Sequence, residues 1–220
     1  MSIFGALEVY HDAARPAAMN MAIDEALLEM ANIPAIRFYR WHSPALSFGY
    51  FGRFADVVDY AAQRDLVRRW TGGGIVLHGD DLTYSVIIPA RDSLFVHSSI
   101  SIYTSVHSAI RNALVASGER AQMAPNESPR VSESCFANPV RADVMVNGRK
   151  VAGAAQRRTR AGLLHQGSIQ QVDLGKHFTE RFAQELSGKW TARNLDQTIF
   201  NRAQEIGEQK YANQAWLRRR

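Results

Sequence analysis

Apolar residues recur at helical spacing in four segments of the chain. In residues 19–31 they follow the i, i+3, i+4, i+7 pattern of an amphipathic helix, at Met19, Ala22, Ile23, Ala26, Leu27 and Met30. The same periodicity predicts a helix over residues 98–117 with Ser98 or Ser99 as its N-cap, a third helix through Phe178, Phe182 and Leu186, and a fourth over residues 195–211.

Short runs rich in β-branched and aromatic residues lie between these helices and predict strands. They are AIRFYRW (35–41), ALSFGYF (45–51), LVRRW (66–70), GIVLH (74–78), LTYSVII (82–88), ADVMV (142–146), RKVAGAA (149–155) and LLHQGSIQ (163–170). The strands come in consecutive groups instead of alternating with helices, so we expect an α+β fold with a mixed, largely antiparallel sheet flanked by helices. Residues 117–134, rich in Ser, Pro, Asn and Glu, are predicted to be a loop within one folded unit that spans residues 1–220.

Composition and charge narrow the class of protein. With 46% hydrophobic and 21% charged residues, the chain is expected to fold around a core. No window approaches the ~20 uncharged apolar residues of a membrane span, and charged residues interrupt the N-terminus before a signal-peptide core can form, so a cytoplasmic protein is expected. The net charge of +5 suits an acidic protein partner. No basic stripe interleaved with aromatic residues accompanies it, so nucleic-acid binding is not expected.

Asn147-Gly148 separates two strand-like runs and predicts a β-hairpin with a type I′ turn. The turn sets a register in which Met145 faces Lys150 and Val144 faces Val151. Lys150 then shares a face of the hairpin with Asp143. By strand geometry alone, Lys150 is either a site residue or the polar side of an exposed hairpin.

Three consecutive glycines, Gly72 to Gly74, interrupt two further strand-like runs. Such a stretch predicts a bend at which backbone N–H groups approach a ligand, although a tight turn gives the same pattern. His78 follows the bend as a base or an orienting donor, or as a structural histidine. The histidines do not fall at metal-ligand spacing, and the chain has one cysteine, so no zinc site is expected.

That cysteine, Cys135, cannot form an intramolecular disulfide. A thiolate is a good nucleophile and a good leaving group, so Cys135 is a candidate for covalent acyl transfer. It is equally a candidate for a small buried apolar residue.

Six segments taken together resemble one family. They are NMAIDEALL (20–28), RFYRWHSPALSFGYF (37–51), RRWTGGGIVLH (68–78), DVMVNGRKVAGAAQRR (143–158), LLHQGSI (163–169) and KYANQAW (210–216). In order and spacing they resemble the catalytic domain of the lipoate–protein ligase and octanoyltransferase superfamily, which is related in fold to the biotin–protein ligases. The resemblance covers almost the whole chain.

The resemblance implies a site. In that family the glycine-rich segment lines the acyl-binding cleft, and the lysine of the GRKVAG-like motif contacts the carbonyl end of the acyl group, which assigns Lys150 to catalysis. The implied substrate-binding residues are Arg69, Gly72, Gly73, Gly74, His78, Asp143, Gly153 and His165.

The superfamily contains ATP-dependent lipoate ligases and cysteine-dependent octanoyltransferases. Cys135 in SCFANP precedes Lys150 by fifteen residues, which resembles the spacing of the nucleophile in the octanoyltransferases. HGDDLTYS (78–85) resembles the H-x-x-[DE]-L-T-Y-S segment of the octanoyltransferases, whereas the ligases usually have a longer segment of HDxGN type at this place. The sequence up to Arg220 leaves no room for the accessory C-terminal domain of many ligases, which also favours the expectation of a transferase, but some ligases keep that domain as a separate chain. Two departures concern ligand contacts, because Gly52 replaces a frequent Gln, and HQGS places His165 one position earlier than the QHGS of the transferases.

The resemblance therefore implies octanoyl transfer from acyl carrier protein, through a Cys135 thioester, to a lysine of a lipoyl domain or a glycine-cleavage H protein. Lys150 would lower the pKa of the thiol and stabilise the oxyanion, and no cofactor is needed. The alternatives are a lipoate ligase that uses ATP and Mg and a non-catalytic acyl-binding protein.

Overall fold

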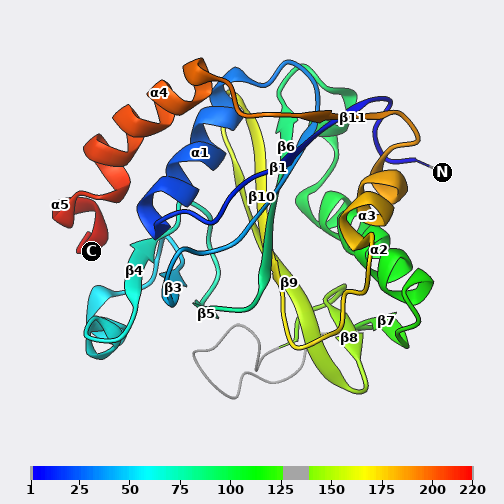
Figure 1. Ribbon diagram of the computed structural model, residues 1–220, viewed down its shortest axis with the longest axis horizontal. Helices are drawn as coiled ribbons and strands as arrows, with labels where there is room; N and C mark the ends of the chain where they lie inside the picture. The colour runs from blue at the N-terminus through cyan, green and yellow to red at the C-terminus, as the bar shows by residue number, and fades with distance from the viewer. Residues whose placement is uncertain (1, 126–138, 220) are drawn as a thin grey trace.

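A mixed sheet forms the centre of the computed structural model, which describes residues 2–125 and 139–219 (Figure 1). In spatial order its strands, within the described residues, are β11 (Trp190–Arg193), β1 (Leu7–His11), β2 (Ala35–Tyr39), β6 (Leu82–Pro89), β10 (Gly162–Ile169), β9 (Arg149–Arg158), β8 (Val144–Val146) and β7 (Ala121–Met123). β1 runs parallel to both of its neighbours, and every other pair is antiparallel. The expected mixed, largely antiparallel sheet is confirmed.

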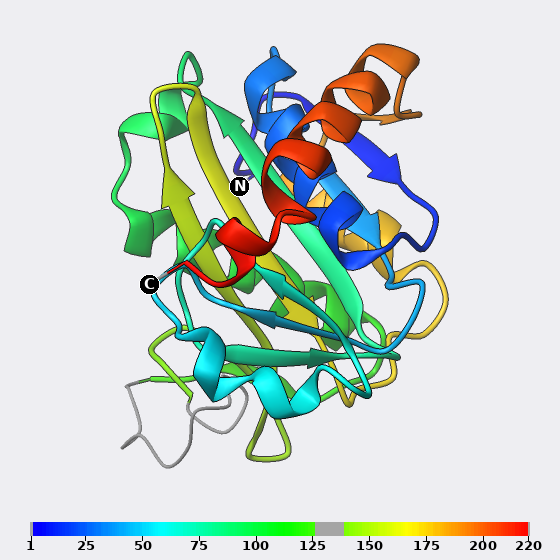
Figure 2. The same cartoon turned by 90° about the vertical axis from the view of Figure 1, so that its left-hand side faces the viewer.

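A second, smaller sheet lies against one face of the first. Its order is β4 (Asp65–Arg68), β3 (Ala45–Phe48) and β5 (Ile75–His78), with β3 parallel to β4 and antiparallel to β5. In Figure 2 these short strands, coloured cyan to teal, cross in front of the long strands of the central sheet. The space between the two sheets holds the site described below.

Helices cover both faces of the central sheet (Figure 1). On one face α1 (Ala17–Met30) packs against α4 (Gln197–Ile206), which continues through a π-helical turn (Gly207–Tyr211) to α5 (Gln214–Leu217). On the other face α2 (Ser99–Ala116) packs against α3 (Phe178–Leu186). Three short 3₁₀ segments complete the described chain, at Phe54–Asp56, Val58–Tyr60 and Ser93–Val96. None of the helices in the described ranges has both the length and the apolar character of a bilayer crossing.

Each face of the central sheet carries its own apolar core. The core under α2 and α3 contains Val86, Val106 and Phe182, and the core under α1 and α4 contains Ile23, Leu27 and Ala203, all at most 2% exposed. The predicted stripes of the helices supply both cores, because side chains three and four residues apart share one face of a helix. Ser98 is the N-cap of α2, and its hydroxyl accepts the Ser101 N–H at 3.2 Å, as the sequence predicted.

Three strands were not predicted, and the predicted helix over 195–211 is regular only to Ile206. The edge strands β7 and β11 are short, and β7 lies within the segment that was expected to be loop. β1 pairs in parallel with β2, which follows it after α1, and with β11, which lies near the other end of the sequence. Such pairing depends on long-range contacts that local periodicity does not report.

A buried ion pair ties α1 to the central sheet. Arg37 on β2 and Asp24 on α1 are both fully buried and are joined by a 2.8 Å contact. Every N–H of the Arg37 guanidinium has an acceptor, since Asp12 and Asn20 take the remaining donors. Asp24 also accepts hydrogen bonds from Tyr39, Ser85 and Gln166. One carboxylate thus joins a helix and three strands.

Removal of this carboxylate should destabilise the whole fold. Asp24→Ala leaves the buried guanidinium without its main counterion, so we expect the free energy of unfolding in urea to fall by about 3–5 kcal/mol. Asp12→Ala is the matched control, because Asp12 contacts the same guanidinium but keeps 5% of its side chain exposed where Asp24 has none, so its loss should cost less. A cost below about 1 kcal/mol for Asp24→Ala, the range of surface pairs, would contradict this assignment.

Candidate functional site

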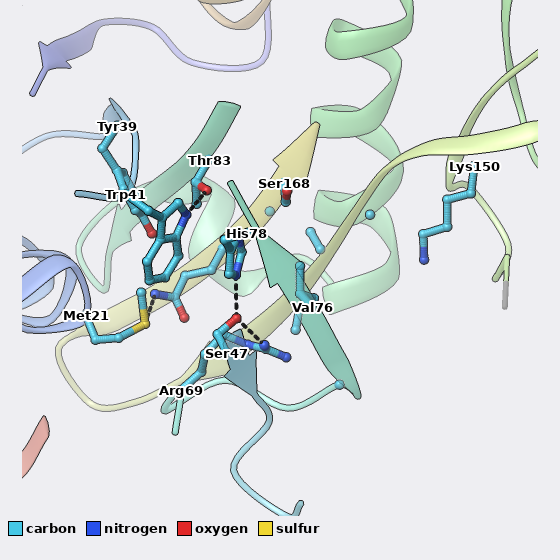
Figure 3. Close-up of a pocket in the computed structure, with 16 residues that line it drawn as sticks. Met21, Tyr39, Trp41, Ser47, Arg69, Val76, His78, Thr83, Lys150 and Ser168 are labelled. Atoms are coloured by element: carbon cyan, nitrogen blue, oxygen red, sulfur yellow. Dashed lines mark hydrogen bonds between the residues drawn. The ribbon is translucent and has the colours of Figure 1, made fainter. Parts of the chain in front are cut away.

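A cleft lies between the small sheet and the face of β9 and β10 (Figure 3). Its polar lining includes Ser47, Arg69, His78, Lys150, Gln166 and Ser168. Its apolar and small lining includes Met21, Tyr39, Trp41, Val76, Gly153 and Ala155. Figure 3 shows Lys150 on one side of the cleft, with Trp41, Ser47 and His78 on the opposite side. The site therefore has a cationic end and an end formed by an aromatic residue and a polar cluster.

Arg69 organises the glycine bend. Its Nη2 donates to the carbonyls of Gly72 and Gly74 at 3.0 and 2.9 Å. Gly73 lines the cleft and has a φ of 86°, a conformation that favours glycine. Its carbonyl lies so close to β3 that a Cβ on Gly49 would stand 2.0 Å away. The bend therefore needs glycine on both sides, and Arg69 fixes its outer carbonyls.

Ser47, His78 and Asp81 form a hydrogen-bonded chain beside Arg69. His78 Nδ1 lies 2.8 Å from Asp81 Oδ2, and His78 Nε2 lies 2.6 Å from Ser47 Oγ. The Asp81 carboxylate only accepts, so in the neutral imidazole Nδ1 carries the proton and Ser47 donates to Nε2. Arg69 in turn donates to Ser47 Oγ at 2.7 Å. The lone pair of His78 Nε2 is therefore already occupied by a hydroxyl.

The environment keeps His78 neutral and Asp81 charged. Burial lowers the pKa of His78, and the hydrogen bond to Asp81 opposes this only in part. Burial acts to raise the pKa of Asp81, but hydrogen bonds from His78, Ser168 and Thr83 outweigh it and lower that pKa to about 2. Trp41 stacks on the His78 ring at 4.0 Å, and its Nε1 donates to Thr83. Asp81 thus holds both rings at this end of the cleft, His78 directly and Trp41 through Thr83, whose hydroxyl donates to Asp81.

Lys150 reaches the cleft from the predicted hairpin. Asn147 and Gly148 both have positive φ, at 50° and 76°, and Met145 pairs with Lys150 as expected. The register beyond that pair was wrong, because Val144 pairs with Ala152 instead of Val151 across an irregularity in β8. Lys150 is only 8% exposed, which excludes the exposed-hairpin interpretation.

The amine of Lys150 is held close to its own strand. Its Nζ lies 2.8 Å from Asp143 Oδ2, and the Asp143 side chain is fully buried. A Cβ added to Gly153 would stand 2.4 Å from Lys150 Cε and 2.7 Å from Nζ. The lysine side chain therefore folds back over Gly153, and Asp143 lies behind it, outside the cleft lining.

His165 does not line the cleft. It lies on the other face of β10, where its Nε2 is 3.3 Å from the hydroxyl of Tyr84, and the same hydroxyl is 3.2 Å from Nε2 of His107. The carbonyl of Ala142 accepts from His107 Nδ1, so Tyr84 donates to His107 and accepts from His165. Gln166 occupies the cleft position instead, because successive residues of a strand point to opposite faces.

The structure brings five of the predicted residues to the cleft, namely Arg69, Gly73, His78, Lys150 and Gly153. Gly72, Gly74, Asp143 and His165 are not among the lining residues. The carbonyls of Gly72 and Gly74 accept hydrogen bonds from Arg69. Cys135 falls outside the described residues. Sequence reasoning missed Ser47, Trp41, Asp81 and Gln166. The strand period was a signal for Ser47 and Gln166, whereas the contacts of Trp41 and Asp81 depend on the packing of the two sheets.

The chain belongs to a known family. Residues 16–208 match the family model described as the lipoyl protein ligase A/B catalytic domain. The resemblance drawn from the sequence motifs is therefore confirmed.

Curated relatives refine this placement. The chain is 40% identical over 162 residues to a protein of Oceanobacillus iheyensis named octanoyltransferase LipM, a match that covers 70% of this chain and 59% of that protein. It is 37% identical over 176 residues to octanoyltransferase LipM of Clostridioides difficile, covering 73% of this chain and 64% of the relative. The match thus spans about three fifths of the length of these relatives.

Solved structures share the fold. A lipoate-protein ligase A bound with ATP superimposes with a TM-score of 0.74 at 21% identity, covering 99% of this chain and 98% of the other. A bipartite lipoate protein ligase, solved in a study with its E2 lipoyl domain from Thermoplasma acidophilum, gives a TM-score of 0.70 at 20% identity and covers 97% and 96% of the two chains. At these identities the likeness supports the fold alone.

The absence of a side chain at Gly153 should be essential for the path of the Lys150 side chain. In Gly153→Ala the new methyl group would lie 2.4 Å from Lys150 Cε, so the side chain has to leave its path and its contact with Asp143. We expect the rate at which acetic anhydride acetylates Lys150, followed by peptide mass spectrometry, to change severalfold. Gly72→Ala is the control, because a Cβ there meets nothing within 4 Å. Equal rates in Gly153→Ala and the unmodified sequence would contradict the packing.

The buried histidines should make the fold sensitive to mild acid. Burial lowers the pKa of His107 to about 4, and it lowers the pKa of His78 and His165 too. The unfolded chain takes up these protons first, near its ordinary pKa of ~6.5, so stability is complete above that pH and falls below it. His107 alone should account for about 3 kcal/mol between pH ~6.5 and 4.

Urea unfolding at steps between pH 7 and 4 measures this slope. His107→Gln keeps a donor for the Ala142 carbonyl but cannot take up a proton, so its stability should fall less steeply over the same range. A variant as steep as the unmodified sequence would refute the assignment of the slope to His107.

Proposed function

We propose that this chain is an octanoyltransferase of protein lipoylation. It moves an octanoyl group from acyl carrier protein to Cys135 as a thioester and then to a lysine of a lipoyl domain or H protein. The observation that carries the proposal is the buried amine of Lys150 at one end of a cleft whose far end is aromatic. The names of the curated relatives support the acyl group and the transferase class.

The cleft suits an acyl chain. Its apolar surface comes from Met21, Tyr39, Trp41 and Val76. On β9 the lining residues Gly153 and Ala155 are small, which leaves space for the acyl chain. Burial of a straight alkyl chain is favourable by about 0.8 kcal/mol per methylene. With the carbonyl beside Lys150, the acyl chain would extend toward Trp41 and His78. The polar atoms of these two rings already have partners, because Asp81 and Ser47 bond to His78 and Thr83 accepts from Trp41.

The first chemical step is thioester exchange. The Cys135 thiolate attacks the carbonyl of the donor, the new S–C bond forms as the old one breaks, and the carrier leaves as a thiolate that takes up a proton. The cation of Lys150 stabilises the negative charge that develops on the carbonyl oxygen. A donor in such a role is typically worth about 3 kcal/mol.

The second step makes an amide. The acceptor lysine loses its proton, its nitrogen attacks the Cys135 thioester, and the Cys135 thiolate is released. An amide is more stable than a thioester, so the step runs forward without ATP, and no metal or cofactor is required. Backbone N–H groups of the glycine bend, of which Gly73 lines the cleft, belong to the proposal as further donors to the same oxyanion. The basic surface of the chain, with a net charge of +5, suits acidic carrier and acceptor domains.

Intact-mass measurement tests the proposal. Incubation with octanoyl acyl carrier protein should add one octanoyl group in a form that hydroxylamine removes. Cys135→Ala should abolish the adduct and reduce transfer to the acceptor by at least a factor of about 10³, and Ser134→Ala, one residue away, should retain both. A chain that forms no adduct, and that lipoylates an acceptor with ATP even as Cys135→Ala, is a ligase. A chain that binds octanoate without either reaction is an acyl-binding protein.

A further inference from the structure

Tyr103 contacts the carboxylate that holds Lys150. Tyr103 lies on α2, is 9% exposed, and its hydroxyl donates a short hydrogen bond to Asp143 Oδ1. The other oxygen, Asp143 Oδ2, accepts from Lys150 Nζ at 2.8 Å and from the Val140 N–H at 2.7 Å. One carboxylate oxygen thus serves the lysine and a backbone turn, and the tyrosine occupies the other oxygen.

The same hydroxyl also contacts β9. Pairing between β8 and β9 ends at Ala152, so among residues 2–125 and 139–219 no strand pairs with Ala154 on that side. The Tyr103 hydroxyl accepts this N–H at 3.2 Å. Ala154 adjoins Gly153, over which the lysine folds. Tyr103 therefore fixes Asp143 and the strand beneath Lys150 relative to each other.

Tyr103 is a permanent donor at this place. Burial and the nearby Asp143 charge raise the pKa of its phenol far above the physiological range. The ring of His107, tilted against that of Tyr103 with their centroids 4.0 Å apart, is kept neutral by burial, which lowers its pKa, and Lys150 is the cation that faces the carboxylate. Without the hydroxyl, Asp143 Oδ1 would lose its donor in a fully buried site, and the lysine amine already bonds to the same carboxylate.

We propose that Tyr103 is a positioning residue of the acyl-transfer site. By occupying Asp143 Oδ1 it keeps the contact of Lys150 with this carboxylate at Oδ2, with the amine at the cleft. In its absence Asp143 turns toward Lys150 and draws the amine away from the acyl carbonyl. The inference rests on the proposed function of Lys150, but its structural part can be tested without any turnover.

Tyr103→Phe is the direct test by activity. In octanoyl transfer from the carrier protein we expect kcat to fall roughly tenfold to a hundredfold, the cost of a displacement of about 1 Å at a reacting centre. KM should be unchanged, because Tyr103 does not line the cleft. Tyr84→Phe is the matched control, since it removes another buried hydroxyl that bonds to His107 and His165 but not to Asp143. It should keep its kcat even where it loses stability.

A double-mutant cycle shows the path of the effect. In the Asp143→Asn background, Tyr103→Phe should cost little more, because the tyrosine acts through the carboxylate. Additive losses, an unchanged kcat in Tyr103→Phe, or an equal loss of kcat in Tyr84→Phe would each overturn the proposal.

Acetylation of Lys150 by acetic anhydride separates this inference from the proposed function. Labelling of Lys150 should be slower in Tyr103→Phe than in the unmodified sequence or in Tyr84→Phe, because a closer contact with Asp143 hinders the amine. If the unmodified chain transfers no octanoyl group but the labelling rates differ in this way, the proposed function fails and the positioning role stands. Equal labelling rates refute the positioning role even in an active enzyme.

Discussion

The Arg37–Asp24 ion pair is the constraint on which the rest of the structure depends. A guanidinium and a carboxylate that are both fully buried must satisfy one another, because an unpaired charge in the core costs several kcal/mol. Their contact fixes α1 against β2, and the remaining acceptor sites of Asp24 take Tyr39 and Gln166. Both of these residues line the cleft, so the interaction that holds the first helix also sets the end wall of the site.

The cleft itself depends on close approaches of backbone. Gly49 allows the glycine bend to lie against β3, and Gly153 allows Lys150 to fold over β9. Around these contacts, buried carboxylates determine where the polar groups point. Asp81 holds His78 in one tautomer, and Asp143 holds the Lys150 amine. A site of this kind is preorganised, because its side chains are already bonded to fixed partners before a substrate arrives.

Much of the fold follows from local patterns. The four helices and eight strands expected from the sequence are present. The helices bury an apolar stripe that repeats at helical spacing, whereas central strands such as β2, β6 and β10 are buried at every residue and were recognised as short runs rich in β-branched and aromatic residues. The hairpin turn at Asn147-Gly148 was predictable, since positive φ at two successive positions selects those residue types. The irregularity that shifts the partner of Val144 to Ala152 was not predicted, because the residue types at the turn do not report a bulge further along the hairpin. β1, β7 and β11 were not predicted either, because each pairs with a strand outside its own stretch of sequence.

By itself, the sequence determined the family, the class of fold and five residues of the cleft, because motif order and the glycine requirements are written into neighbouring positions. The sequence also shows that His165 and Gln166 stand in the reverse order to the QHGS of the transferases. Which of the two side chains faces the cleft could be decided only once the faces of β10 were known. Only the tertiary structure decided that Gln166 lines the cleft and that the Ser47 hydroxyl bonds to Nε2 of His78. It also decided that Asp143 binds the Lys150 amine and that Tyr103 bonds to Asp143. These contacts join residues far apart in the chain, and the packing of the two sheets and α2 brings them together.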